Sequence, residues 1–173
     1  MNKTILVYAT RWGATTETAQ EIKNVLSEKY NIEVDLVNLK DKKKKENRNP
    51  DISPYENIII GISVAKFRWA KEGKKFLKKN KGALAGKKLF VFVSSGGAGE
   101  AYQKRNIEEY ERLQKKWIDN NLDKWGIKFT SRKAFGGRYV GQYSHLGDNR
   151  DWSQIRSWAE EVGKIIDSGE LNC

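Results

Sequence analysis

Short runs of consecutive apolar residues, separated by stretches of helical periodicity, are the feature that most constrains the fold of this chain. The clearest runs are Ile5–Ala9, Ile58–Ile62 and Leu89–Val93. Each run is short and has polar neighbours, which is typical of a strand that is buried on both of its faces. Parallel sheets covered by helices on both sides bury their strands in this way, so the runs indicate an α/β fold.

Between these runs, apolar residues recur at the spacing of amphipathic helices. The pattern predicts a helix from Thr15, a long amphipathic stretch over 107–125 and a last helix over 152–166. Alternation over Ile32–Val37 predicts a half-exposed edge strand, and 133–136 indicates a short fifth strand. Four tryptophans fall on the helical stripes and are expected in the core: Trp117, Trp125, Trp152 and Trp158.

The alternation of strands and helices predicts a three-layer α-β-α sandwich with a doubly wound parallel sheet. We expect residues 1–173 to form a single domain, because a length of 173 residues fits one domain better than two. A chain of this length buries about two-thirds of its unfolded surface, which is enough for a core without disulfides or metals.

Cysteine and histidine usage excludes several classes of protein. The only cysteine is Cys173 and the only histidine is His145, so we expect no disulfide framework and no metal site. No apolar run approaches the roughly 18 residues of a membrane span, and Ile5–Ala9 is too short for a signal-peptide core. A cytoplasmic protein is therefore expected. For His145, two roles stay open: an exposed bystander, or a proton donor near a ligand.

A strong excess of positive charge points to acidic partners. Lys and Arg number 33 against 22 Asp and Glu, which gives a net charge of +11. Nucleic acid, an anionic membrane, an acidic protein and a phosphorylated ligand all fit that excess. Because the lysines are not interleaved with exposed aromatic residues or a known reading motif, we expect no nucleic-acid binding.

Two basic clusters stand out along the chain. The stretch 40–48 is expected to be a loop or a frayed short helix, since its four consecutive lysines repel one another. The second cluster is on the helix predicted after the third strand, and it has two interpretations: a solvated face, or a docking surface for an acidic redox partner. Its members are Lys71, Lys74, Lys75, Lys78, Lys79 and Lys81.

The segment after the first strand has the composition of a phosphate site. Ligands of open α/β sheets bind at the carboxyl ends of the strands, and a helix N-terminus there attracts anions. The segment comprises Thr10, Arg11, Trp12, Gly13, Ala14 and Thr15. Its hydroxyls, cation and glycine suit a phosphate monoester, yet it matches neither a dinucleotide fingerprint nor a P-loop. The alternative is that Thr15 is an ordinary helix cap and Arg11 a surface residue.

The segments after the third and fourth strands suit a flat ligand. The first offers small residues, cations and aromatics, and the second has three glycines in four residues, which allow close approach of the backbone. A simple flexible turn is the alternative for the second segment. The candidate binding residues are Ser63, Val64, Ala65, Lys66, Phe67 and Trp69, followed by Ser94, Ser95, Gly96, Gly97, Ala98, Gly99 and Tyr102.

With these three segments in register, the chain resembles the flavodoxin-like FMN-binding family over essentially its whole length. The sequence T-R-W-G-A-T at 10–15 looks like the FMN phosphate loop of that family. The resemblance implies a five-stranded parallel sheet of order 2-1-3-4-5 and FMN as the cofactor. It also implies that the two later segments flank the flavin ring, with Trp69 and Tyr102 as the residues that stack on it.

A narrower resemblance is to the menaquinone-dependent protoporphyrinogen oxidases, which also have a flavodoxin domain. They share a T-R-x-G-x-T loop, an I-G-x-S segment like 60–63 and a D-W-x-Q segment like 151–154. The chain departs from that group after the fifth strand. Where the group has a long basic and apolar insertion, this chain has only Arg138–Arg150 before the last helix.

These resemblances imply three functions, all of which stay open on the sequence. The first is an FMN-binding electron carrier with an acidic redox partner protein or a small electron acceptor. The second is an FMN-dependent oxidoreductase of the protoporphyrinogen oxidase type with its own substrate, and the third is a non-catalytic binding module. Lys66 and Arg68 would lie near the ring, where cations stabilise the reduced, anionic flavin and raise its potential. The alternative is that both side chains point into solvent.

Overall fold

The computed structural model describes residues 3–169, so Cys173 lies outside the described residues. The strands are β1 (Thr4–Ala9), β2 (Val34–Asn38), β3 (Asn57–Ala65), β4 (Arg68–Trp69), β5 (Lys88–Ser94) and β6 (Ser131–Phe135). The helices are α1 (Ala14–Tyr30), α2 (Lys71–Lys79), α3 (Lys81–Leu84), α4 (Gly96–Gln103), α5 (Ile107–Gln114), α6 (Asn120–Lys124) and α7 (Trp152–Asp167).

Five of the strands form a parallel sheet in the order β2-β1-β3-β5-β6. In the register of the sheet, Val7 of β1 pairs with Val37 of β2 and with Ile60 of β3, and Ile60 pairs with Val91 of β5. This arrangement confirms the predicted doubly wound sheet of order 2-1-3-4-5, because β5 and β6 are its fourth and fifth parallel strands.

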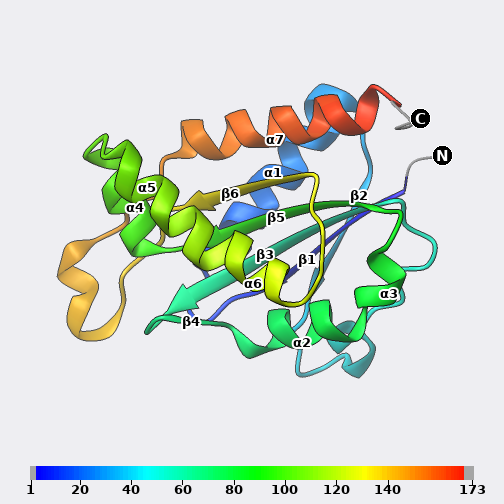
Figure 1. Cartoon of the computed structure of the whole chain (residues 1–173), viewed down its shortest axis with the longest axis horizontal. Coiled ribbons are helices and arrows are strands. Elements are labelled where there is room, and N and C mark those ends of the chain that lie inside the picture. Colours follow the sequence, from blue (N-terminus) through cyan, green and yellow to red (C-terminus); the bar gives the residue numbers. More distant parts are fainter. Residues whose placement is uncertain (1–2, 170–173) are drawn as a thin grey trace.

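Helices cover the sheet on both faces and make three layers (Figure 1). One face packs against α1 and α7 through a cluster that includes Leu6, Ile59 and Phe92. The other face packs against α2, α5 and α6 through a cluster that includes Val7, Ile60 and Trp117. Alternate residues of each strand therefore enter different cores, as expected for strands buried on both faces.

Local signals set the ends of the two helices on the α1 side of the sheet. Gly13, with φ 89°, precedes α1, and Asn31, with φ 53°, follows it. The carboxylate of Asp151 accepts a hydrogen bond of 3.1 Å from the backbone N–H of Gln154, so Asp151 is the N-cap of α7. Helix α1 therefore begins immediately behind the segment predicted to bind phosphate.

The predicted amphipathic stretch over 107–125 consists of α5, one π-helical turn over Lys115–Asp119, and α6. Its side chains also cover the outer edge of β6. Gln114 accepts a hydrogen bond of 3.1 Å from the N–H of Ala134, and the Tyr110 hydroxyl donates one of 2.6 Å to the carbonyl of Ala134. Burial raises the pKa of Tyr110. The four helical tryptophans lie in or against the two cores, as predicted.

The third strand is longer than predicted and turns back on itself. β3 extends to Ala65, and β4 pairs with it in antiparallel fashion, with Ala65 opposite Arg68. The two residues of the turn, Lys66 and Phe67, have φ angles of 49° and 60°. Both angles lie in the left-handed region, as in the two-residue hairpin turns that match the twist of a sheet. The predicted loop over 63–69 is therefore a hairpin.

The basic stretch 40–48 has the structure expected of it. The stretch 40–48 forms turns and a short 3-10 helix at Lys45–Arg48. Over residues 3–169, no helix has both the length and the apolar character needed to cross a membrane.

Candidate functional site

The carboxyl ends of the parallel strands meet at one end of the molecule, where the arrowheads point in Figure 1. The β1–α1 loop, the β3–β4 hairpin, the start of α4 and the β6–α7 loop all leave the sheet at this end. This is the position at which open α/β sheets bind ligands, beside the point where the strand order reverses. The reversal here falls between β1 and β3.

The β1–α1 loop presents the unpaired end of a long helix. The Gly13 carbonyl accepts hydrogen bonds of 3.1 Å and 3.4 Å from the N–H groups of Thr16 and Glu17. Among the described residues, the N–H groups of Ala14 and Thr15 have no backbone acceptor. The Thr10 hydroxyl accepts a hydrogen bond of 2.9 Å from the N–H of Gly13, which folds the loop into a tight turn. Free N–H groups and the helix dipole together favour an anion at this position.

A row of hydroxyl groups lies on the sheet beneath the start of α1. Thr10 directly follows β1, Ser63 lies within β3 opposite Ser94, and Ser94 ends β5. By strand alternation the three share the face that packs against α1. The buried Thr15 hydroxyl donates a hydrogen bond of 3.1 Å to the Ser94 hydroxyl. Ser63 is 8% exposed, and its Oγ is buried without a hydrogen-bond partner among the described residues.

A buried hydroxyl without a partner is costly, so Ser63 needs an explanation. Its place in the middle of the hydroxyl row gives one, because a polar ligand in the crevice would supply the missing partner. The row and the free N–H groups of α1 together fit a phosphorylated ligand.

The two large side chains of the β1–α1 loop point in different directions. Arg11 is held back toward the hairpin, since its Nη2 donates a hydrogen bond of 3.1 Å to the carbonyl of Trp69. Trp12 is 47% exposed and supplies an aromatic surface at the rim of the loop. Arg11 is therefore not directed at the anion site, and its predicted phosphate contact would require it to turn.

The tip of the β3–β4 hairpin supplies a second exposed aromatic group. Phe67 is 82% exposed, and Lys66 and Arg68 on either side are also exposed. The ammonium of Lys116 lies 5.7 Å from the centre of the Phe67 ring. Within the same predicted segment, Val64 packs against the core. A positive φ at Lys66 and at Phe67 carries a steric cost because neither residue is a glycine, and such strain is frequent at functional sites.

Neither of the two residues predicted to stack on a flat ligand is placed to do so. Trp69 is 8% exposed; its indole N–H donates a hydrogen bond of 2.8 Å to the carbonyl of Trp117, and its ring packs edge-on against Trp125. Tyr102 is partly exposed but packs against Tyr110, with ring centres 5.6 Å apart. Trp69 therefore belongs to the core, and Tyr102 belongs to the outer side of α4.

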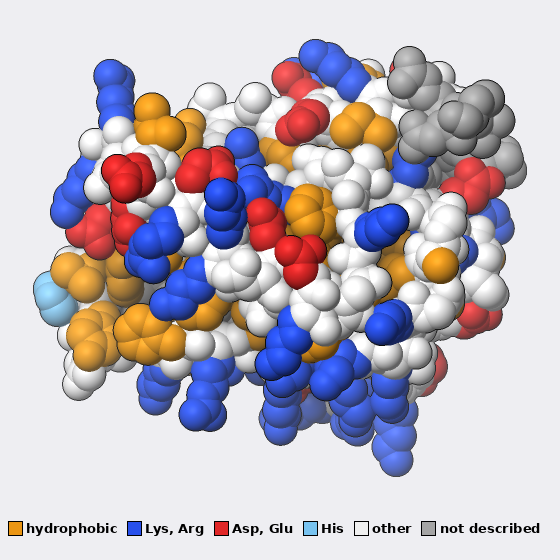
Figure 2. Space-filling view, in the orientation of Figure 1, with side chains coloured by type: hydrophobic (Ala, Val, Ile, Leu, Met, Phe, Trp, Pro, Cys, Tyr) orange, Lys and Arg blue, Asp and Glu red, His pale blue; other side chains and the backbone are white. Residues whose placement is uncertain are grey.

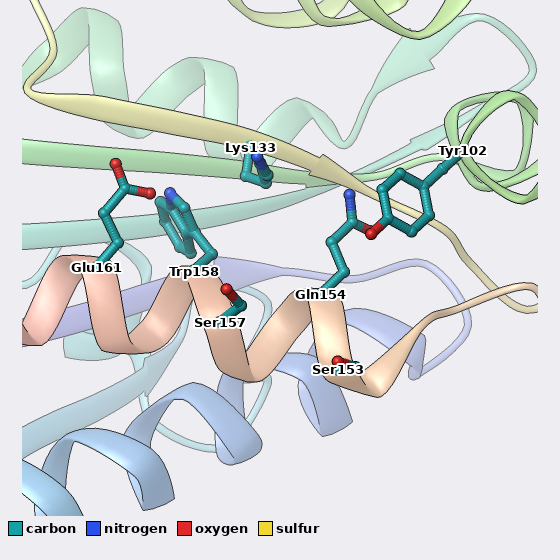
Figure 3. Close-up of a pocket in the computed structure, with 7 residues that line it drawn as sticks. All are labelled: Tyr102, Lys133, Ser153, Gln154, Ser157, Trp158 and Glu161. Atoms are coloured by element: carbon teal, nitrogen blue, oxygen red, sulfur yellow. The ribbon is translucent and has the colours of Figure 1, made fainter. Parts of the chain in front are cut away.

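Tyr102 lines a shallow cavity that lies along β6 and α7, away from the crevice (Figure 3). The cavity has a volume of about 220 Å³. In Figure 3, Gln154 of α7 lies beside the Tyr102 ring, and Lys133 of β6 lies further along the cavity. Gln154 is held by a hydrogen bond of 2.9 Å to the Tyr110 hydroxyl, which belongs to the network that covers the edge of β6.

The glycine-rich segment after β5 also differs from its prediction. It forms the first turn of α4, with the Ser95 hydroxyl accepting a hydrogen bond of 3.3 Å from the N–H of Ala98 as the N-cap. A Cβ at Gly96 would lie 2.6 Å from the Tyr139 hydroxyl, and one at Gly99 would collide with Asn149. These two glycines let another loop of the chain, rather than a ligand, approach α4. Gly97 is exposed.

The loop that approaches is the β6–α7 loop, from which the sequence offered only His145 as a residue near the ligand. Asn149 donates a hydrogen bond of 2.7 Å to the carbonyl of Gly96 and accepts one of 2.9 Å from the N–H of Gly137. Arg150 donates one of 3.0 Å to the carbonyl of Ala14. Arg138 donates one of 3.2 Å to the carbonyl of Trp12. Residues of the β6–α7 loop therefore contact α4, the first residue of α1 and the β1–α1 loop.

Other residues of the β6–α7 loop are exposed. His145 lies in a 3-10 turn at Gly141–Leu146, with its Nδ1 3.2 Å from the carbonyl of Gln142. Tyr143 and Leu146 are 55% and 54% exposed. Figure 2 shows hydrophobic side chains gathered around the histidine at this end of the molecule. Among residues 3–169, no cluster of metal-ligating side chains is present.

Charge is distributed unevenly over the surface. The described ion pairs join α1 to α7 and to the β6–α7 loop, or join β6 to α5 and to the π-helical turn. The others lie on α4, on α5 or within the β6–α7 loop. None of the exposed lysines of α2 and α3 has an ion-pair partner in the described part of the chain. Figure 2 shows the resulting row of basic side chains along the edge of the molecule that α2 occupies in Figure 1.

The sheet order and the covering helices define a doubly wound α/β protein of the flavodoxin fold. The sequence model of the flavodoxin domain matches residues 5–141, and the chain belongs to that family. No curated protein matches the chain.

Solved structures of flavodoxins share the whole fold. Oxidised flavodoxin 1 from Bacillus cereus is 17% identical with a TM-score of 0.61, and the match covers 94% of this chain and 98% of that one. A short-chain flavodoxin associated with a non-canonical PDU bacterial microcompartment is 17% identical with a TM-score of 0.59, covering 96% and 99%. A flavo di-iron protein variant from Thermotoga maritima is 16% identical with a TM-score of 0.60, covering 95% of this chain and 36% of that one.

Proposed function

We propose that this chain binds FMN in the crevice at the carboxyl ends of β1, β3 and β5, and that it acts as an electron carrier. The observation that carries the proposal is the buried, unpaired hydroxyl of Ser63 beneath the start of α1. Membership of the flavodoxin domain family supports the same ligand. FMN would supply the electron transfer itself, and the protein would hold it and set its electrostatic surroundings.

The start of α1 is the proposed phosphate site. The free N–H groups of Ala14 and Thr15 would donate to the phosphate, and the Thr10 hydroxyl would bind it beside them. Ser63 would donate its hydroxyl to the polar part of the ligand. Gly13 matters for its backbone, because its φ of 89° orients the loop and its missing Cβ leaves the approach open.

The ring would lie between the aromatic groups that the structure leaves exposed at the rim. Trp12 of the β1–α1 loop and Phe67 of the hairpin tip replace Trp69 and Tyr102 as the residues proposed to flank it. Lys66 and Arg68 would place two cations beside the ring and so favour its reduced, anionic form.

An acidic redox protein is the proposed partner. Support comes from the unpaired lysines of α2 and α3, which continue from the hairpin tip along one edge of the molecule (Figure 2). A field of this sign accelerates encounter with an acidic surface and loses its effect as salt is added.

An enzyme of the protoporphyrinogen oxidase type would need a pocket for its substrate over the ring. The chain segment available to build that pocket, 137–150, is short, and both of its ends are fastened to α4 and to the β1–α1 loop. The geometry therefore favours the carrier over this alternative. A non-catalytic module of the same fold would bind no FMN, and the experiment below separates it from both.

The test compares two serine variants in FMN binding and in stability. Ser63→Ala removes the unpaired hydroxyl, so the proposal predicts FMN affinity lower by roughly 2- to 10-fold and an apo-protein at least as stable as the parent. Ser131→Ala is the control, because its hydroxyl accepts a hydrogen bond of 3.0 Å from Trp158 far from the crevice. This control should lose stability and keep its FMN affinity. Equal FMN binding by Ser63→Ala and the parent would contradict the proposed site.

A further inference from the structure

The β6–α7 loop is a closed structure that is fastened at its base. Arg138 and Asp148 form a β-bridge, and the N–H of Tyr139 donates a hydrogen bond of 2.9 Å to the carbonyl of Gly147. The N–H of Asn149 donates one of 3.1 Å to the carbonyl of Gly137. Backbone hydrogen bonds within the loop therefore fix the position of the Arg138 backbone.

Arg150 anchors this loop beneath α1. Its side chain is 2% exposed and lies 2.5 Å from the carboxylate of Asp148 and 2.7 Å from that of Glu17. A further hydrogen bond of 3.0 Å joins it to the carbonyl of Ala14. Because its partners are all protein groups at short range, Arg150 has a structural role.

Arg138 contacts the same carboxylate, that of Glu17, but it is bound less completely than Arg150. Its Nη2 donates a hydrogen bond of 3.2 Å to the carbonyl of Trp12 and is 3.3 Å from the position that a Cβ of Gly13 would take. Its Nη1 contacts the Glu17 carboxylate at 3.2 Å. The side chain is 37% exposed, and among the described residues its Nε has no acceptor. The guanidinium thus lies over the β1–α1 loop and still has N–H donors, such as Nε, without an acceptor among the described residues.

We propose that Arg138 binds the phosphate group of FMN beside the α1 N-terminus, an inference that rests on the proposed function. Glu17 would be the counter-ion that holds the guanidinium over the loop until the phosphate replaces it. The unpaired Ser63 hydroxyl below the loop is the independent sign that a polar ligand enters here. The site would then select phosphorylated flavin through the positive charge of Arg138, which the β6–α7 loop supplies.

The proposal requires Arg138 to distinguish FMN from riboflavin, which has the same ring without the phosphate. In Arg138→Gln, FMN affinity should fall by roughly 10- to 100-fold, the usual range for losing a charge-assisted hydrogen bond. Riboflavin affinity should change by less than about 2-fold. Arg138→Lys keeps the charge and should recover part of the loss. Titration by quenching of flavin fluorescence measures both ligands.

Arg156→Gln is the matched control, because Arg156 forms a similar exposed pair with Glu21 at 3.5 Å, one turn further along α1. It should leave the affinity for both flavins unchanged. If the parent binds FMN and Arg138→Gln binds it with the same affinity, this inference is overturned and the proposed function still stands. Equal losses for FMN and riboflavin would also overturn it, since they would assign Arg138 a structural role. A parent that binds neither flavin would overturn both proposals.

Discussion

The hydroxyl of Thr15 donates a hydrogen bond of 3.1 Å to the hydroxyl of Ser94, and so joins the first turn of α1 to the end of β5. Thr15 is fully buried and Ser94 is 5% exposed. The bond holds the helix whose N-terminus is the proposed phosphate site at a fixed place over the sheet. Its removal therefore tests how the fold positions the site.

Thr15→Val should destabilise the apo-protein by about 1–3 kcal/mol, because it leaves the Ser94 hydroxyl buried without a partner. The double variant Thr15→Val with Ser94→Ala should be more stable than Thr15→Val alone, since both polar groups are then gone. Urea unfolding followed by tryptophan fluorescence measures the free energies of unfolding of the parent, of Thr15→Val, of Ser94→Ala and of the double variant. A double variant that loses the sum of the two single losses would show that the two hydroxyls do not interact.

Gly13→Ala should weaken FMN binding as well as stability. The φ of Gly13 is 89°, and its new methyl group would lie 3.3 Å from the Arg138 guanidinium. Gly86→Ala is the matched control, because the φ of Gly86 is 81° and nothing lies within 4 Å of its Cβ position. Both variants should lose about 1–2 kcal/mol of stability to backbone strain. Only Gly13→Ala should bind FMN more weakly. A similar loss of FMN affinity in both variants would contradict a specific effect of the new methyl group on the β1–α1 loop.

The arginine-linked carboxylates near α1 should make the protein sensitive to acid. The hydrogen bond from Arg150 lowers the pKa of Glu17, and the contact with Arg138 adds to the effect. Burial raises the pKa of Asp148, but Arg150 more than offsets this, so its pKa also lies below the usual range. A lowered pKa stabilises the fold above the ordinary carboxyl pKa of about 4, and the stabilisation is lost as pH falls through the lowered value.

Glu17→Gln should therefore show a smaller loss of stability between pH 5 and pH 3 than the parent, although it is less stable at pH 7. Urea unfolding at several pH values gives the comparison. Glu28→Gln, which removes an exposed carboxylate of α1 that has no ion-pair partner among the described residues, is the control and should follow the parent closely. A Glu17→Gln curve parallel to that of the parent would mean that this pair does not link folding to pH.

The hairpin cations should raise the reduction potential of bound FMN. Replacing Lys66 and Arg68 by glutamine should make the two-electron potential more negative, on the order of 10 mV for each exposed charge. The difference should shrink in high salt, because exposed charges are screened. Lys164→Gln, in the last turn of α7, is the control and should leave the potential unchanged. A potential independent of Lys66 and Arg68 at low salt would place both side chains away from the ring.

Docking on the α2 surface should depend on salt and on the sign of the partner. Lys75→Glu with Lys79→Glu reverses two exposed, unpaired charges and should slow electron transfer to an acidic ferredoxin. The rate with the parent should itself fall as salt rises. Stopped-flow absorbance measures both effects. Unchanged ferredoxin kinetics in the variant would mean that α2 is only a solvated face.

The fold was predictable because its signals are local. Runs such as Ile5–Ala9 specify buried strands from their own composition, and the helical spacing of apolar residues over 152–166 specifies the last helix. The β1–α1 loop was predictable for the same reason, since a helix N-terminus after a buried strand presents free N–H groups whatever surrounds it.

The rest of the site depends on contacts between distant segments. Trp69 looks like a stacking residue in the sequence, but its indole N–H bonds to Trp117, which lies 48 residues away in the chain. Gly99 looks like an opening for a ligand, yet Asn149 fills the space beside it. The polar sequence of the β6–α7 loop gave no sign that Arg138 folds back over Trp12. A pattern of neighbouring residues in the sequence carries no information about such contacts between distant segments.

Titration of the apo-protein with FMN and with riboflavin tests the central claim most directly. The account predicts that one FMN binds per chain, that its fluorescence is quenched, and that riboflavin binds at least tenfold more weakly because it lacks the phosphate held at the start of α1. Absence of FMN binding, or equal affinity for the two flavins, would contradict the proposal that this crevice is an FMN site built around its phosphate.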